Sequence, residues 1–140
     1  MRALVVDDSR AMRSILSRIL AKAGADEIWE AGDGREAIAR IESSGSPDLV
    51  LVDWNMPVMN GLDFIVALRR NTDWRRVTIV MVTTENAQSQ VVRALAAGAH
   101  EYLIKPFDEC ALLEKLDLLG LYSPEQAGRS ALALNSQGHI

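Results

Sequence analysis

LVLVDWNMP, residues 49–57, is the stretch of this sequence that decides the fold. Residues 49–52 are four branched apolar side chains in a row, which is typical of a strand that is buried on both faces of a parallel sheet. The run stops at the carboxylate of Asp53, where a turn is expected to start. The segment therefore predicts a buried strand that brings an acidic residue to one edge of a sheet.

Outward from this stretch, strand-like and helical segments alternate along the chain. Further runs rich in branched residues lie at 3–6, 27–30, 78–82 and 101–104. After Ser9, an apolar stripe from Met12 to Ala23 ends at Gly24, and further helices are predicted at 35–42, 62–70, 87–97 and 108–119. Strands that alternate with such helices imply right-handed crossovers. The predicted fold class is α/β, a single doubly wound sheet of five parallel strands with five helices.

The composition indicates one globular domain followed by a tail. The 140 residues are 49% hydrophobic and 24% charged, enough for one compact core and too few for two full domains. Residues 121–140 contain Ser123-Pro124, several small residues and no sustained periodicity. They are expected to form a flexible tail with one helical turn around 130–134, which leaves a domain at 1–120.

Several classes of function are disfavoured by the residue content. The single cysteine, Cys110, cannot form an internal disulfide, and two histidines are too few for a zinc site. A net charge of -4 disfavours a nucleic-acid partner. The apolar runs are far shorter than the ~20 residues that span a bilayer, and no secretory signal is recognised. We therefore expect a cytoplasmic protein with no membrane partner.

Chemically useful side chains collect at the ends of the predicted strands. Asp7 and Asp8 follow the first strand, Asp53 the third, Thr83 the fourth and Lys105 the fifth. Parallel strands share one carboxyl edge, where such folds bind ligands. Each residue has a local alternative as a helix cap or turn residue, yet unit charges ~4 Å apart repel by about 1 kcal/mol in water and about 4 kcal/mol at a typical protein dielectric. A hard divalent cation offsets this repulsion, and an all-oxygen site suits Mg²⁺ better than Zn²⁺.

This set of residues suits phosphoryl chemistry. The two aspartates of the first run can share a metal site only if the strand ends before them, because neighbours in a strand point to opposite faces. With Mg²⁺ held there, Asp53 can act as a nucleophile toward a phosphoryl donor. Lys105 would offset the phosphoryl charge, and the Thr83 hydroxyl would donate a hydrogen bond to a phosphoryl oxygen. Asp53 itself and the backbone carbonyl of Asn55 would complete the metal shell.

These motifs together resemble the receiver domains of two-component response regulators, and within that family the stand-alone chemotaxis regulators. The resemblance runs over residues 4–119. The matching stretches are VVDDS at 5–9 with Met12-Arg13, VDWNMP at 52–57 with Asn60-Gly61-Leu62, Met81-Val82-Thr83, Ala97-Gly98-Ala99 and Lys105-Pro106-Phe107.

The resemblance implies a flavodoxin-like strand order of 2-1-3-4-5 and a cis bond before Pro106. It implies that Asp53 accepts a phosphoryl group from a sensor histidine kinase or a histidine phosphotransfer protein, with Mg²⁺ as cofactor. The chain is then a phosphoacceptor that assists its own phosphorylation and dephosphorylation, and not an enzyme. Phosphorylation in the family draws Thr83 toward the phosphoryl group and turns an aromatic residue, here Tyr102, inward. This remodels the face made by the fourth helix, fifth strand and fifth helix.

Three residues are expected to set the lifetime of the phosphoryl group. Asn55 and Glu85 occupy positions that influence its loss in the family, so self-dephosphorylation is expected. Thr84 departs from the usual alanine or glycine, and its extra atoms would restrict the access of water or a phosphatase.

Other outputs and activities remain open at this stage. A receiver domain can bind a downstream target such as a flagellar motor switch, relay its phosphoryl group, or serve as a phosphate sink. A haloacid-dehalogenase-type phosphatase also uses an aspartate, a lysine and Mg²⁺, but Asn55 stands where that family has a second aspartate, and no segment is long enough for a cap domain. A nucleotide binder is disfavoured because no glycine-rich phosphate loop follows the first strand.

Three side chains outside this set also receive an expected placement. Arg13, beside the polar side of the first helix, is expected to be solvated. Trp54 is expected to be partly exposed near the site, and Cys110 to pack on the inward stripe of the last helix.

Overall fold

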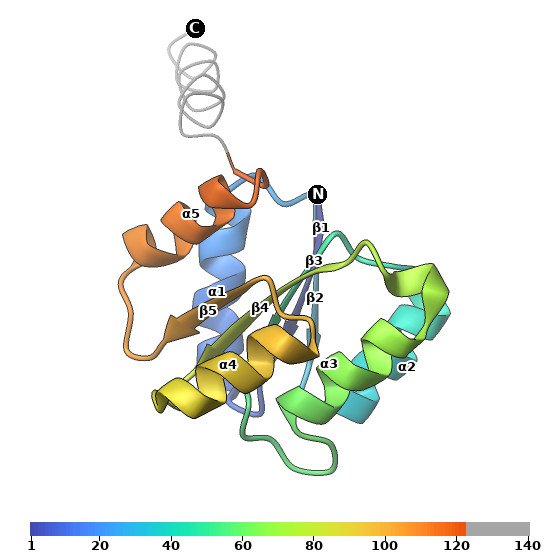
Figure 1. Cartoon of the computed structure of the whole chain (residues 1–140). Coiled ribbons are helices and arrows are strands. Elements are labelled where there is room, and N and C mark those ends of the chain that lie inside the picture. Colours follow the sequence, from blue (N-terminus) through green and yellow to red (C-terminus); the bar gives the residue numbers. More distant parts are fainter. Residues whose placement is uncertain (123–140) are drawn as a thin grey trace, which may run out of the picture.

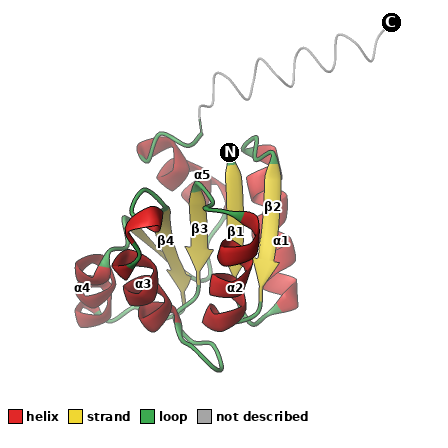
Figure 2. Cartoon of the chain, turned by 90° about the vertical axis from the view of Figure 1, so that its right-hand side faces the viewer, coloured by secondary structure: helices red, strands yellow, loops and turns green. Residues whose placement is uncertain are grey.

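Five parallel strands form one sheet in the order β2-β1-β3-β4-β5, which confirms the predicted topology. In Figure 2, β2, β1, β3 and β4 lie side by side and their arrowheads point to the same edge. The computed structural model describes residues 1–122 (Figure 1). The strands are β1 (Arg2–Val6), β2 (Glu27–Ala31), β3 (Leu49–Val52), β4 (Thr78–Thr83) and β5 (Glu101–Ile104).

Five α-helices cover the sheet on both faces. They are α1 (Arg10–Lys22), α2 (Gly34–Ser44), α3 (Gly61–Arg70), α4 (Gln88–Ala97) and α5 (Glu109–Leu118), with a 3₁₀ turn at Thr72–Trp74 that the sequence did not predict. In Figure 1, α1 and α5 lie on one side of the sheet, and α2, α3 and α4 lie on the other. The predicted helices agree with these within two residues at each end.

The alternation of side chains along each strand produces two cores. Ala3 and Val5 of β1 pack with α1 and α5, whereas Leu4 and Val6 pack with α2, α3 and α4. β3 behaves in the same way and is fully buried, which explains its uninterrupted apolar sequence. The two cores thus hold the sheet from both faces, and the sheet sets the positions of the residues that follow each strand.

The expected placements of Trp54 and Cys110 are wrong. Trp54 is only 6% exposed and packs in the core under α2, α3 and α4. Cys110 is exposed, because the inward stripe of α5 is made by Leu112 and Leu116 instead. In both cases the burial of the side chain depends on how the loop or helix packs against the sheet, which local spacing does not determine.

The chain beyond α5 continues to pack on the domain for a short distance. Leu121 and Tyr122 are partly buried against the core under α1 and α5. The N–H of Leu121 donates to the carbonyl of Leu116 at 2.9 Å. The helical turn expected around 130–134, and the rest of the expected tail, lie outside the described residues.

Candidate phosphoacceptor and metal site

The carboxyl ends of β1 and β3 bring three aspartates together. Asp7, Asp8 and Asp53 each offer a carboxylate oxygen, and these oxygens lie within 4.8 Å of one another. β1 ends at Val6, so Asp7 and Asp8 are not held on opposite faces of a strand. The N–H of Asp53 donates to the Val6 carbonyl at 2.9 Å, which extends the sheet ladder by one residue. The three residues therefore form one acidic cluster at the edge that the sequence predicts.

Lys105, which follows β5, reaches across this cluster. Its Nζ donates to Oδ2 of Asp7 at 2.7 Å and to Oδ2 of Asp53 at 3.2 Å. Burial by itself would lower the pKa of Lys105, but the hydrogen bond to Asp7 and the charges of Asp53 and Asp7 outweigh it, so the pKa lies above its ordinary value. The ammonium group therefore stays charged, and the bond before Pro106 is cis, as the resemblance implies.

The charges and donor atoms of the cluster fit a divalent cation. Lys105 offsets one of the three carboxylate charges, so about two negative charges of the cluster remain uncompensated. Carboxylate oxygens are the hard ligands that Mg²⁺ prefers. Asp7 and Asp53 are buried, with 1% and 9% exposed, whereas Asp8 is exposed and keeps the cluster open to solvent. A hexacoordinate ion that retains several waters suits such a partly open site.

Arg13 holds the first of these aspartates in place, a role that the sequence analysis missed. Its Nη1 donates to the backbone carbonyl of Asp7 at 2.7 Å, and its Nε donates to Glu30 at 3.1 Å. Arg13 is therefore not simply solvated, since only 18% of its side chain is exposed. Ser9 assists: its N–H donates to Oδ1 of Asp7 at 2.8 Å while its hydroxyl caps α1. The signal was present in the Met12-Arg13 pair of the matching motif.

The loop that follows Asp53 is closely packed and strained. A Cβ on Gly61 would lie 2.1 Å from the Asp53 carbonyl oxygen, so only glycine fits where the loop returns. Gly61 also donates its N–H to the Trp54 carbonyl at 2.9 Å. Val58, at the tip, has a φ of +68°, and the N–H of the next residue donates to the carbonyl of the preceding one at 2.7 Å, the hydrogen bond of a γ-turn. A β-branched residue is costly in this conformation.

The loop between β4 and α4 gathers the other predicted residues. Thr83 is fully buried, and its Oγ1 accepts from the N–H of Glu85 at 3.3 Å. The Asn55 side chain donates to Oε1 of Glu85 at 2.9 Å, and the Tyr102 hydroxyl donates to the Glu85 backbone carbonyl at 2.7 Å. Thr84 is exposed. Glu85 thus makes hydrogen bonds with Asn55, which is predicted to tune dephosphorylation, and with Thr83 and Tyr102, the predicted switch residues.

Tyr102 lies in the inward position in this structure. It is 8% exposed and packs in the core under α4. Burial raises the pKa of its hydroxyl above the ordinary value, and the negative charges of Glu85 and Asp53 raise it further. The hydroxyl therefore stays protonated and remains a hydrogen-bond donor.

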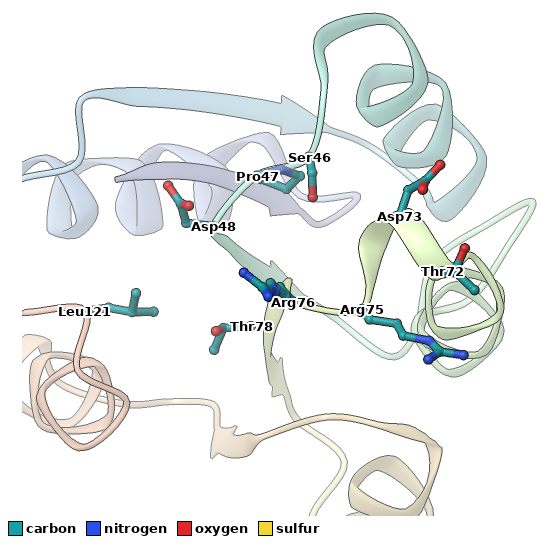
Figure 3. Close-up of a pocket in the computed structure, with 9 residues that line it drawn as sticks. All are labelled: Ser46, Pro47, Asp48, Thr72, Asp73, Arg75, Arg76, Thr78 and Leu121. Carbon is teal, nitrogen blue, oxygen red and sulfur yellow. The ribbon is translucent and has the colours of Figure 1, made fainter.

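A separate hollow lies at the opposite, amino edge of the sheet. Figure 3 shows its lining, which comes from Ser46, Pro47, Asp48, Thr72, Asp73, Arg75, Arg76, Thr78 and Leu121. None of the predicted site residues lines it. The acidic cluster, not this hollow, is the candidate site.

The model of the response regulator receiver domain matches residues 3–117. The chain belongs to this family. Receiver domains bind Mg²⁺ at an acidic cluster, and Asp7, Asp8 and Asp53 form such a group here. Receiver domains are signalling proteins rather than classical enzymes.

The relatives of this receiver domain are of the CheY type. It is 41% identical to the chemotaxis protein CheY homolog of Campylobacter jejuni, over 91% of this chain and 98% of the relative. It is 39% identical to the chemotaxis protein CheY1 of Helicobacter pylori, over 85% and 96%. The structure of the chemotaxis response regulator CheY4 of Vibrio cholerae matches with a TM-score of 0.76 and 38% identity, over 83% of this chain and 95% of that one. Across residues 1–122, no helix is long and apolar enough to cross a membrane.

Proposed function

We propose that this receiver domain acts as a stand-alone response regulator that accepts a phosphoryl group on Asp53. The observation that carries the proposal is the acidic cluster with Lys105 Nζ within 3.2 Å of Asp53. A fold gains no stability from three clustered carboxylates, because their mutual repulsion opposes folding. Such a cluster serves a function when it binds a cation that in turn attracts the transferred phosphoryl group.

Each residue of the cluster has a separate task in the transfer. Asp7, Asp8 and Asp53, with the backbone carbonyl of Asn55, would hold Mg²⁺, which would supply positive charge to offset the phosphoryl oxygens. A carboxylate oxygen of Asp53 attacks the phosphorus of a phosphohistidine, and the bond between phosphorus and the donor nitrogen breaks. Lys105 exchanges part of its contact with the carboxylates for contact with the incoming phosphoryl oxygens. The Thr83 hydroxyl donates a hydrogen bond to one of those oxygens.

The output surface is the face made by α4, β5 and α5. Movement of Thr83 toward the phosphoryl group acts on the β4–α4 loop, where the N–H of Glu85 donates to Oγ1 of Thr83 and the carbonyl of Glu85 accepts from the Tyr102 hydroxyl. Val92 and Leu95 of α4 and Ile104 of β5 are exposed apolar side chains that a downstream protein can bind. Because the relatives are named as chemotaxis proteins, a flagellar motor switch is the proposed target, in the cytoplasm.

Self-dephosphorylation returns the protein to its resting state. The Asn55 side chain donates a hydrogen bond to Oε1 of Glu85 at 2.9 Å. These two side chains can orient a water for attack on the phosphoryl group of Asp53. Thr84 is exposed, and its extra side-chain atoms would slow the approach of water or of a phosphatase. The phosphoryl lifetime separates a motility signal from a relay intermediate or phosphate sink.

The test is intact mass spectrometry after mixing the protein with acetyl phosphate and Mg²⁺. The expected result is the gain of one phosphoryl group, lost when Mg²⁺ is chelated and absent in Asp53→Asn, which removes the nucleophile and keeps the shape. Uptake at the wild-type level by Asp53→Asn would contradict the assignment of the acceptor. No uptake by the wild type, with Mg²⁺ binding confirmed, would identify a degenerate receiver.

A further inference from the structure

Helix α4 is weakly attached to the rest of the domain. Ala94 is its one fully buried residue, with Val91 and Ala97 only partly buried against the core, whereas α3 buries Gly61, Phe64, Ile65 and Leu68. The N-terminus of α4 also has no side-chain cap, in contrast to α1, α2, α3 and α5. With little buried apolar area and an uncapped end, the placement of α4 depends strongly on a few side-chain contacts.

One of these contacts reaches the residue next to the phosphoacceptor. The guanidinium carbon of Arg93 lies 5.6 Å from the centroid of the Trp54 ring, within the range of a cation–π interaction. Trp54 is nearly fully buried and directly follows Asp53 in the chain. Arg93 is held in addition by a hydrogen bond from its Nη1 to Gln90 at 2.9 Å, on the preceding turn of the same helix. The middle of α4 is therefore tied to a rigid side chain beside the site.

We propose that Arg93 is a positioning residue that couples the charge on Asp53 to the placement of α4. The inference rests on the proposed function, since it requires phosphorylation of Asp53. Phosphorylation replaces the single charge of the Asp53 carboxylate by a group of charge up to about −2, a net gain of about one negative charge beside Trp54, which strengthens the attraction for a cation held over that ring. Val92 and Leu95 are exposed and lie one turn apart on α4, so a change in the position of the helix changes the apolar surface offered to a partner.

The chain offers a matched control for this contact. Arg40 of α2 lies 5.0 Å from the centroid of Trp29, so it makes the same kind of interaction. Trp29 belongs to β2, at the edge of the sheet that is remote in strand order from β4 and β5. Arg40→Met therefore removes a cation–π contact without acting on α4.

The experiment compares hydrogen exchange of α4 amides with and without acetyl phosphate and Mg²⁺, in the wild type, Arg93→Met, Arg93→Lys and Arg40→Met. Intact mass is recorded for every sample. In the wild type, phosphorylation is expected to slow exchange in α4. Without donor, Arg93→Met is expected to exchange about two- to fivefold faster in α4, and its slowing on phosphorylation is expected to fall by at least half. Arg93→Lys keeps a cation over the ring and is expected to restore the response, and Arg40→Met is expected to match the wild type.

A second signal reports on the ring itself. In protein labelled with 5-fluorotryptophan, the ¹⁹F resonance of Trp54 is expected to shift on phosphorylation in the wild type, and to shift less in Arg93→Met. A full response of α4 in phosphorylated Arg93→Met, or an equal loss in Arg40→Met, would overturn the coupling and leave the proposed function intact. Absence of phosphoryl uptake by the wild type would overturn both.

Discussion

Charged side chains are arranged differently at the two edges of the sheet. At the amino edge, charged groups are paired or accept backbone hydrogen bonds. Nε of Arg2 lies 3.6 Å from Oε1 of Glu27, and Nζ of Lys115 lies 3.2 Å from Oε1 of Glu101. Oδ2 of Asp48 accepts from the N–H of Arg2 at 2.7 Å. At the carboxyl edge, three carboxylates share one lysine, and the adjoining loop holds a valine at positive φ. The amino edge therefore supports the fold, whereas the carboxyl edge keeps repulsion and strain that the proposed cation binding and phosphoryl transfer would use.

The largest expected effect comes from removing Lys105, the lysine that contacts both Asp7 and Asp53 at the carboxyl edge. Lys105→Met leaves two buried carboxylates without their partner, so the free energy of unfolding in a metal-free buffer is expected to fall by about 2 to 3 kcal/mol. Mg²⁺ is expected to restore part of this loss by occupying the cluster. Chemical denaturation with and without Mg²⁺ measures both. Lys115→Met, at the amino edge, is the control and is expected to cost less than about 1 kcal/mol, because the pair with Glu101 is more exposed. Equal losses in the two variants would remove the distinction between the edges.

Removing one negative charge from the cluster is expected to weaken cation binding. Asp8→Asn keeps the shape of the side chain and is expected to reduce Mg²⁺ affinity about tenfold or more, because affinity depends on the number of charged ligands. Isothermal titration calorimetry gives the affinity directly. Asp48→Asn, at the amino edge, is the control, since an amide oxygen can still accept the N–H of Arg2. If both variants bound Mg²⁺ like the wild type, the acidic cluster would not be the metal site.

The strain at Val58 is expected to appear as a gain in stability when it is relieved. Val58 is 79% exposed, so its replacement removes little packing. Val58→Gly is expected to raise the free energy of unfolding by about 0.5 to 1 kcal/mol, since glycine adopts positive φ freely but loses more entropy on folding. Denaturation in urea measures the change. Val58→Ala keeps a Cβ and is expected to gain less. A loss of stability in Val58→Gly would mean that the γ-turn is not strained.

The smallest expected effect concerns the pH dependence of a histidine at the amino edge. Nδ1 of His100 accepts from the Ile79 N–H at 3.1 Å and faces the Arg69 guanidinium at 3.3 Å. Burial lowers the pKa of His100, and the charge of Arg69 lowers it further, so the folded state resists protonation more than the unfolded chain does. Stability is therefore fully present above the unfolded pKa of about 6.5 and declines as the pH falls below it.

His100→Asn tests this, because its amide oxygen can accept the same hydrogen bond and does not titrate. The stability of the wild type relative to His100→Asn is expected to be smaller at pH 5.5 than at pH 8, as measured by thermal unfolding. A difference that is the same at both pH values would show that His100 does not titrate in this range.

The comparison of the edges also explains which features were predictable. The strand residues were predictable because burial on both faces leaves a continuous apolar run, as in Leu49–Val52. The acidic residues could be assigned to one edge because parallel strands end together. The burial of Trp54, the exposure of Cys110 and the contact of Arg13 with Asp7 were missed, because each depends on how a loop or helix is seated on the sheet.

The sequence by itself determined the order of strands and helices, the doubly wound class and the residues that would follow each strand, since hydrophobic periodicity and glycine stops are local properties. Only the tertiary structure decided which of those residues meet. Lys105 and Asp7 are 98 positions apart in the chain, and their 2.7 Å contact exists because β5, β4, β3 and β1 lie in one sheet. The same is true of Arg93 over Trp54, since nothing in the spacing of α4 specifies the ring on which it rests.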